Sequence, residues 1–152
     1  MQSRWTLAAA ATALAALALT GCSSPPPDYD PPPGALVAGT AQVSVNGTDL
    51  GLTDTVQCDP AGTLLMMTTR DPDDPEAPGI SATIASEDEL VVRQVGIRDL
   101  GGFTGSYNQG LGGEATVTMT DRTYDIQGTA DGFDTDNPSF RTTGNFKIKI
   151  AC

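Results

Sequence analysis

The chain contains 152 residues, which at roughly 100–200 residues per domain predicts one domain and its tails. It carries 8 Lys and Arg residues against 19 Asp and Glu residues, so its formal charge is -11 and it lacks the basic surface that nucleic-acid binding requires. It contains no histidine, which excludes a Ser-His-Asp or Cys-His nucleophile and any imidazole metal ligand. Because of its net negative charge, we expect no nucleic-acid partner for this chain.

The N-terminus has the features of an export signal. One positive charge precedes the apolar run Trp5–Leu19, which is shorter than the roughly 20 residues that a stable membrane span needs. The run ends at Leu19-Thr20-Gly21-Cys22, where small residues precede a cysteine, as in the lipobox of bacterial lipoproteins. We predict a lipoprotein signal peptide at residues 1–21, cleavage between Gly21 and Cys22, and lipidation of Cys22. The alternative is an ordinary secretory signal followed by a chance cysteine.

The next segment, residues 22–37, has the composition of a linker. Ser23–Gly34 reads SSPPPDYDPPPG, with six prolines and no aliphatic side chain to bury. Proline triplets favour polyproline II at about 3.1 Å per residue, which predicts a semi-rigid stalk of roughly 30–40 Å. The alternative is a proline-rich ligand for a recognition module. With acyl chains on Cys22, the sequence predicts an exported protein that is lipid-anchored on the extracytoplasmic face of the cell membrane.

Residues 38–152 have the pattern of an all-β domain, because apolar and polar residues alternate in short runs separated by turns. In chain order the expected runs are Ala41–Val45 with an Asn46-Gly47 hairpin turn, Leu50–Cys58 on one parity, Gly62–Thr69, Ile80–Ile84, Leu90–Ile97, Ala115–Thr120, Tyr124–Gly128 and Phe146–Cys152. This spacing predicts a single antiparallel β-sandwich or open barrel. A short helix is expected at residues 134–140, where Asp and Asn suit a helix N-cap.

Two cysteines remain once Cys22 is lipidated. Cys58 and Cys152 each continue the apolar face of an expected strand, so both side chains should point into the core. The compartment beyond the membrane permits disulfides, and this pair would close a long loop. We expect a disulfide between Cys58 and Cys152. Two buried free thiols are the alternative, and a redox-active pair would need the C-x-x-C spacing that is absent here.

Three further patterns bear on chemistry. The acidic segment Arg70–Gly79 lacks the spacing of an EF-hand, which favours an exposed loop over a calcium site. The acids and amide of Asp131–Asn137 are interpreted as helix caps, again with a calcium site as the alternative. The glycine-rich segment Gly101–Gly113 is interpreted either as a hairpin loop or as a flexible lip for an apolar ligand, formed by Phe103, Tyr107 and Leu111. We expect no cofactor and no bound metal.

The lipobox and several motifs of the domain together resemble the mycobacterial lipoprotein antigen family, the LpqH-like surface lipoproteins. The motifs are V-x-V-x-G with a later V-x-C ending at Cys58, YDIQGTADGF, D-N-P, and a terminal F-x-I-x-I-x-C strand. The resemblance covers about Gln42 to Cys152. It implies a palmitate-type lipoprotein of the mycobacterial envelope, an antigen whose acyl chains engage host innate receptors. It also implies Cys22 as the lipidation site and Cys58–Cys152 as the disulfide.

These observations predict a non-enzymatic, lipid-anchored envelope protein that displays its domain as a surface antigen. The alternative is a carrier module that holds a lipid or glycolipid in the β-domain. A third hypothesis, a carboxylate-based hydrolase, requires two acids that face one cleft. The expected partners are therefore the membrane through the lipid anchor, host innate receptors, and a lipid or glycolipid ligand.

Overall fold

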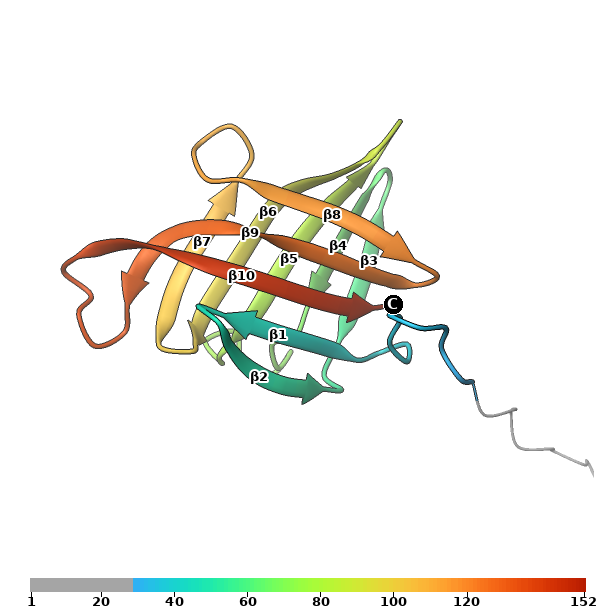
Figure 1. Cartoon of the computed structure of the whole chain (residues 1–152), viewed down its shortest axis with the longest axis horizontal. Coiled ribbons are helices and arrows are strands. Elements are labelled where there is room, and N and C mark those ends of the chain that lie inside the picture. Colours follow the sequence, from blue (N-terminus) through green and yellow to red (C-terminus); the bar gives the residue numbers. More distant parts are fainter. Residues whose placement is uncertain (1–28) are drawn as a thin grey trace, which may run out of the picture.

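The computed structural model describes residues 29–152, so Gly21 and Cys22 lie outside the described residues. Ten strands and no helix occur in this part of the chain (Figure 1). The strands are β1 (Ala41–Val45), β2 (Thr48–Thr53), β3 (Gln57–Ala61), β4 (Leu64–Thr68), β5 (Gly79–Ser86), β6 (Leu90–Leu100), β7 (Phe103–Asn108), β8 (Ala115–Thr120), β9 (Thr123–Asp134) and β10 (Arg141–Ala151). Nothing between residues 29 and 152 forms a helix that is long and apolar enough to cross a membrane.

All ten strands belong to one antiparallel sheet that curls into a half-barrel (Figure 1). The strand order is β2-β1-β10-β9-β7-β6-β5-β4-β3, and β8 pairs with β9 off this path. The sheet divides at β9, because the first half of β9 pairs with β8 and its second half pairs with β7. β8, β9, β10, β1 and β2 therefore cross over the layer formed by β3 to β7 (Figure 1). The all-β prediction is confirmed, in the form of one curled sheet.

The core lies between the two layers and follows from the period-two alternation. Along β10, Phe146, Ile148 and Ile150 are buried while Lys147 and Lys149 point to the opposite face. Burying each large apolar side chain stabilises the fold by about 1.5–3 kcal/mol. The layer of β3 to β7 contributes the facing buried side chains Met67, Ile80, Ile84, Val92, Val95, Ile97 and Phe103.

Two glycines of β9 allow the neighbouring strands to approach it closely. A Cβ at Gly128 would lie 2.1 Å from the carbonyl oxygen of Glu114, and a Cβ at Gly132 would lie 2.0 Å from that of Thr104. Both obstacles are backbone atoms, so a side chain at either position would displace β8 or β7. The division of β9 between two partner strands therefore depends on these glycines.

The hairpin between β1 and β2 confirms the expected turn at Asn46-Gly47. Asn46 has φ 50° and Gly47 has φ 79°, and positive φ at both central residues is the requirement of a type I′ turn. Asn and Gly are the residues that adopt this conformation at least cost. The register of β1 against β2 begins directly at this turn, with Val45 opposite Thr48.

The prediction of a short helix at residues 134–140 is wrong. The segment forms successive turns instead, in which the Asn137 amide donates to the Asp134 carbonyl (3.0 Å) and the Phe140 amide donates to the Asn137 carbonyl (3.1 Å). β9 and β10 pair up to Phe133 opposite Arg141, so the connection has to reverse the chain within a few residues. Pro138 has no N–H to continue a helical ladder. The polar residues therefore serve a strand connection rather than a helix cap.

The single-parity run expected from Leu50 to Cys58 is divided into two strands. β2 ends at Thr53 and β3 begins at Gln57, at opposite ends of the sheet order. Leu50 and Leu52 are 40% and 66% exposed, whereas Cys58 packs against the core. Residues that share a parity in sequence therefore do not share a face here, because the chain leaves one layer and enters the other between them.

Candidate functional site

The N-terminal segment enters the domain beside the C-terminal end of β10. The Gly39 amide donates to the Ala151 carbonyl (2.9 Å), and the Ala151 amide donates to the Thr40 carbonyl (2.9 Å). The Leu36 amide donates to Oγ1 of Thr123 at the start of β9 (2.8 Å). Figure 1 shows the incoming chain and the C-terminus at the same end of the half-barrel. A tether attached to this segment therefore pulls on one defined end of the domain.

Contacts continue upstream into the expected linker. The Tyr29 hydroxyl donates to a carboxylate oxygen of Asp121 in the β8–β9 turn, and this hydrogen bond raises the pKa of the Tyr29 phenol. Nζ of Lys149 donates to the Gly34 carbonyl (3.1 Å). Residues 29–40 thus lie along the domain, and the remainder of the predicted stalk, Ser23–Asp28, lies outside the described residues.

Cys58 and Cys152 form a disulfide bond, as predicted from the sequence. Their Cα atoms lie 6.0 Å apart across a sequence separation of 94 residues. Cys58 belongs to β3, the last strand of the sheet order, and Cys152 directly follows β10. β3 and β10 are not hydrogen-bonded neighbours, so the bond joins the two layers of the curled sheet where the backbone does not.

The three residues expected to form a ligand lip are not brought together. The glycine-rich segment contains β7, and its Phe103 and Tyr107 side chains are 0% and 7% exposed in the core. The Phe103 ring occupies space that Gly144 leaves free, since a Cβ there would lie 2.8 Å from its Cζ. Leu111, in the β7–β8 connection, is 82% exposed. The flexible lip for an apolar ligand stays a prediction, and Leu111 is the accessible side chain among its three residues.

The acidic segment between β4 and β5 is an exposed loop, as expected. Two of its carboxylates bind its own backbone: Oδ1 of Asp71 accepts from the Asp73 amide (2.9 Å), and Oδ1 of Asp74 accepts from the Glu76 amide (3.0 Å). Across residues 29–152, no three Cys, Asp or Glu side chains are grouped as metal ligands. These carboxylates therefore stabilise local turns, as Asx side chains commonly do.

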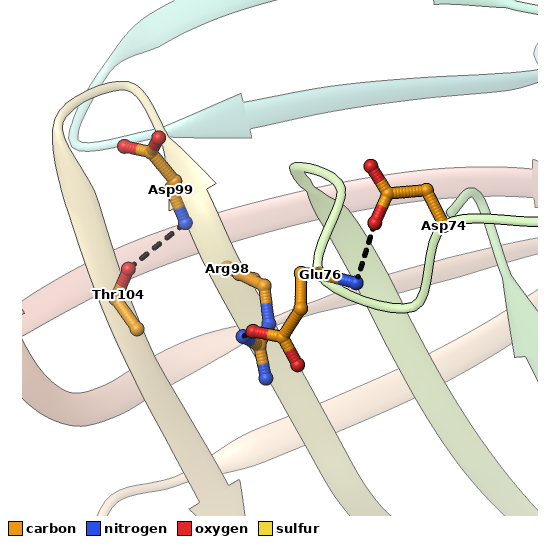
Figure 2. Close-up of polar contacts among 5 residues, drawn as sticks. All are labelled: Asp74, Glu76, Arg98, Asp99 and Thr104. Atoms are coloured by element: carbon orange, nitrogen blue, oxygen red, sulfur yellow. Dashed lines mark hydrogen bonds and ion pairs between the residues drawn. The ribbon is translucent and has the colours of Figure 1, made fainter. Parts of the chain in front are cut away.

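The loop also reaches across to the sheet. Figure 2 shows Glu76 beside Arg98 of β6, with which it forms an ion pair. Next to Arg98 the register of β6 against β7 shifts, and the Asp99 amide donates to Oγ1 of Thr104 (2.9 Å). Such an irregularity re-aims side chains at the end of a strand. Arg98 lies on the outer face of the sheet, opposite the buried side chain of Ile97.

Two grooves share the outer face of β1, β10 and β9. The larger has a volume of about 610 Å³ and the smaller about 340 Å³, and both are lined by Ser44, Gln127 and Lys147. The larger groove is also lined by the polar side chains of Glu114, Thr116, Thr129 and Asn145 and by the apolar side chains of Ala115 and Phe146. The hydroxyls, amides and charges of this mixed lining can form hydrogen bonds with a polar group such as a sugar.

The smaller groove places two carboxylates on one cleft, which the hydrolase hypothesis requires. Asp49 accepts hydrogen bonds from Nε2 of Gln42 (2.9 Å) and from the Gly51 amide (2.8 Å). Asp125 lies 3.4 Å from Nζ of Lys149. Each carboxylate is thus engaged by a neighbour in the sheet, and the hydrolase hypothesis stays a prediction.

A third groove, of about 410 Å³, lies on the outer face where β6, β7 and β9 adjoin. It is lined by Arg70, Arg98 and Arg141, three of the eight basic residues of the chain. Sequence reasoning missed this groove, because its arginines come from distant segments that only the strand order brings together. Asp131, which was interpreted as a helix cap, lines it as well and accepts a hydrogen bond from Oγ1 of Thr143 (3.1 Å).

Comparison with known proteins identifies the family of this chain. Residues 34–152 match the family described as Mycobacterium 19 kDa lipoprotein antigen. The chain belongs to this lipoprotein antigen family. The resemblance noted in the sequence motifs is thereby confirmed, and membership in a lipoprotein family implies export and membrane anchoring.

Relatives within the lipoprotein antigen family match over nearly the whole chain. A protein of Mycobacterium indicus pranii that is named as a lipoprotein is 34% identical over 97% of this chain and 97% of its own length. Lipoprotein LpqH of Mycobacterium tuberculosis strain H37Rv is 29% identical over 100% of this chain and 99% of its own length. These alignments include the N-terminal segment with Cys22, which precedes the residues matched by the family model.

Proposed function

We propose that this family member is anchored by acyl chains on Cys22 to the extracytoplasmic face of the cell membrane, where it displays the half-barrel as a surface antigen. One observation carries the proposal: in a chain of the lipoprotein antigen family, a short apolar segment ends at Leu19 and is followed by Thr20-Gly21-Cys22. One acyl chain of myristoyl size anchors a protein only marginally, whereas two or three chains hold it stably. The acylated N-terminus is also the part that engages host innate receptors.

The position of the tether supports a defined orientation of the displayed domain. The incoming chain binds at the C-terminal end of β10, and β10 extends for 11 residues away from that point, or roughly 36 Å at 3.3 Å per residue. The β9–β10 connection at the opposite end therefore points away from the membrane. It carries Phe140, which is 73% exposed, so this end offers the most membrane-distal surface for recognition.

Replacing Cys22 tests the anchor directly. In the native host, Cys22→Ala should move the protein from the membrane fraction to the soluble fraction, and mass spectrometry should find no acyl mass. Ser23→Ala, which alters the adjacent residue, should leave the protein acylated and membrane-bound. Retention of the Cys22→Ala protein in the membrane fraction would refute the proposed anchor.

A second candidate function, carriage of a lipid or glycolipid, is favoured by the groove of about 610 Å³. The polar side chains of its lining would bind a sugar headgroup through hydrogen bonds. Native mass spectrometry of protein extracted mildly from its own membrane distinguishes the two functions. An additional lipid mass that is lost on unfolding supports carriage, whereas a clean acylated mass supports display alone.

A further inference from the structure

The groove on β6, β7 and β9 concentrates positive charge on a strongly acidic protein. Arg70 follows β4, Arg98 lies in β6 and Arg141 begins β10, yet all three line the same 410 Å³ space. Asp131 is the acidic residue of the same lining, so three guanidinium groups face one carboxylate. The chain as a whole has a formal charge of -11. Its composition therefore does not account for a locally cationic groove.

Arg70 is seated in the sheet surface rather than extended into solvent. Its Cγ lies 2.8 Å from the position of a Cβ at Gly79, so a side chain there would displace it, and its Nη2 passes over Gly96, 3.6 Å from the position of a Cβ there. Its Nε is buried and has no hydrogen-bond partner in the described part of the chain. Burial and the neighbouring charge of Arg98 lower the pKa of Arg70, and Glu76 opposes them.

The anionic side chains around the groove leave two of its guanidinium groups without an ion pair. Glu76 pairs with Arg98 but is 79% exposed, so solvent screens this interaction strongly. Asp131 is engaged by the hydroxyl of Thr143. Within residues 29–152, neither Arg70 nor Arg141 forms a salt bridge. Like charges gathered on one surface repel each other, and a bound anion offsets this repulsion.

The wall of the groove is held in place by the adjoining turns. The Thr135 amide donates to the Gly102 carbonyl (2.8 Å), and the Thr135 hydroxyl donates to Oδ1 of Asp99 (3.1 Å). These bonds tie the β9–β10 connection, which carries Pro138, to the β6–β7 turn. A wall fixed in advance reduces the ordering cost of binding a ligand.

We propose that this groove binds a phosphate ester. The guanidinium groups of Arg70, Arg98 and Arg141 bind the phosphate oxygens, since the planar fork of N–H donors matches them in bidentate geometry. The hydroxyls of Thr104 and Ser106, which also line the groove, donate further hydrogen bonds. The volume of about 410 Å³ exceeds one phosphate group and leaves room for a glycerol or sugar moiety against Phe133 and Pro138.

The test uses the full acylated protein in non-ionic detergent, titrated with glycerol 3-phosphate and with inorganic phosphate. NMR signals of the Arg70, Arg98 and Arg141 side chains should shift saturably. Arg141→Gln should weaken binding about 10- to 100-fold, as expected for losing hydrogen bonds to a charged group. Arg122→Gln is the matched control, because it removes the same charge from the β8–β9 turn, and it should change the affinity less than about twofold, as a distant charge does at physiological salt.

The ester can come from a soluble metabolite or from a lipid headgroup, and a second measurement separates these sources. Because the groove lies toward the membrane-distal β9–β10 connection, the protein in detergent is titrated with short-chain, water-soluble phosphatidylglycerol, and with short-chain phosphatidylcholine as the control. Shifts of the three arginines on adding phosphatidylglycerol assign a headgroup, and shifts with glycerol 3-phosphate alone assign a soluble ester. The proposal is overturned if neither ligand shifts them, or if Arg141→Gln and Arg122→Gln weaken binding equally.

Discussion

Cys58 and Cys152 are bonded between the two layers of the curled sheet, with Cα atoms 6.0 Å apart and a sequence separation of 94 residues. Cys58 lies in β3, an edge strand that pairs with β4 alone, and Cys152 ends the chain beyond β10. The bond therefore holds an edge strand of one layer to the other layer. It also ties the end of the domain at which the N-terminal segment enters.

Removing this disulfide should destabilise the domain. Cys58→Ala combined with Cys152→Ala should lower the free energy of unfolding by about 2–5 kcal/mol, because a long loop in the unfolded chain is no longer closed. Urea denaturation followed by circular dichroism measures the change. Each single variant should lose about as much as the pair, because either one breaks the same bond. An unchanged unfolding midpoint would show that the core alone holds the two layers together.

Gly144 should be intolerant of a side chain because of Phe103. A Cβ at Gly144 would lie 2.8 Å from Cζ of the buried Phe103 ring, so Gly144→Ala should cost about 1–3 kcal/mol through overpacking. In a Phe103→Leu background the added cost of Gly144→Ala should be smaller, since leucine has no atom at Cζ. A double-mutant cycle of unfolding free energies checks this coupling, and equal costs in both backgrounds would contradict it.

The pairing of β8 with β9 should depend on Gly128. Gly128→Ala would place a Cβ 2.1 Å from the backbone oxygen of Glu114, so we expect β8 to detach from β9. Hydrogen exchange should then lose protection along residues 115–120 while β10 stays protected. Thr118→Ala, on the exposed face of β8, is the control and should change stability by less than about 0.5 kcal/mol.

The contact between Tyr29 and Asp121 should weaken at alkaline pH. The hydrogen bond raises the pKa of Tyr29 above its ordinary value of about 10, because it favours the protonated phenol. The stabilisation that this hydrogen bond contributes is therefore complete below about pH 10, and it is lost as the pH rises through the raised pKa of Tyr29. The carbon chemical shift of the Tyr29 ring reports this titration. Asp121→Asn should return the pKa toward its ordinary value, and an unaltered titration curve would contradict the contact.

Truncating Phe103 should destabilise the domain far more than truncating Leu111, although the sequence predicts both in one ligand lip. Phe103→Ala should cost about 3–5 kcal/mol because it empties a core site, whereas Leu111→Ser should stay within about 0.5 kcal/mol. Thermal unfolding measures both. A test of the lip should therefore use Leu111, because loss of binding in a Phe103 variant could reflect unfolding alone.

Much of this domain is specified by local patterns that a sequence reader can follow. The alternation around Ile148 identifies a buried face, and Asn46-Gly47 specifies a hairpin because it supplies positive φ at two successive positions. Apolar parity with Ile148 and Ile150 placed Cys152 toward the core, and parity with Val56 did so for Cys58, although Leu50 and Leu52 of the same expected run are exposed. The short apolar run before Cys22 predicts the anchor through its length and its junction. Each inference concerns residues within a few positions of one another.

Only the tertiary structure decided how these local elements meet. The polar segment at 134–140 became a strand connection because β9 and β10 pair to their ends, and Phe103 turned inward because Gly144 faces it across the core. Arg70, Arg98 and Arg141 share a groove because of the strand order. Alternation tells which side of a strand is buried, but not which strand lies beside it. Pairing is set by non-local contacts that satisfy the whole core together, and no short stretch of sequence carries that information.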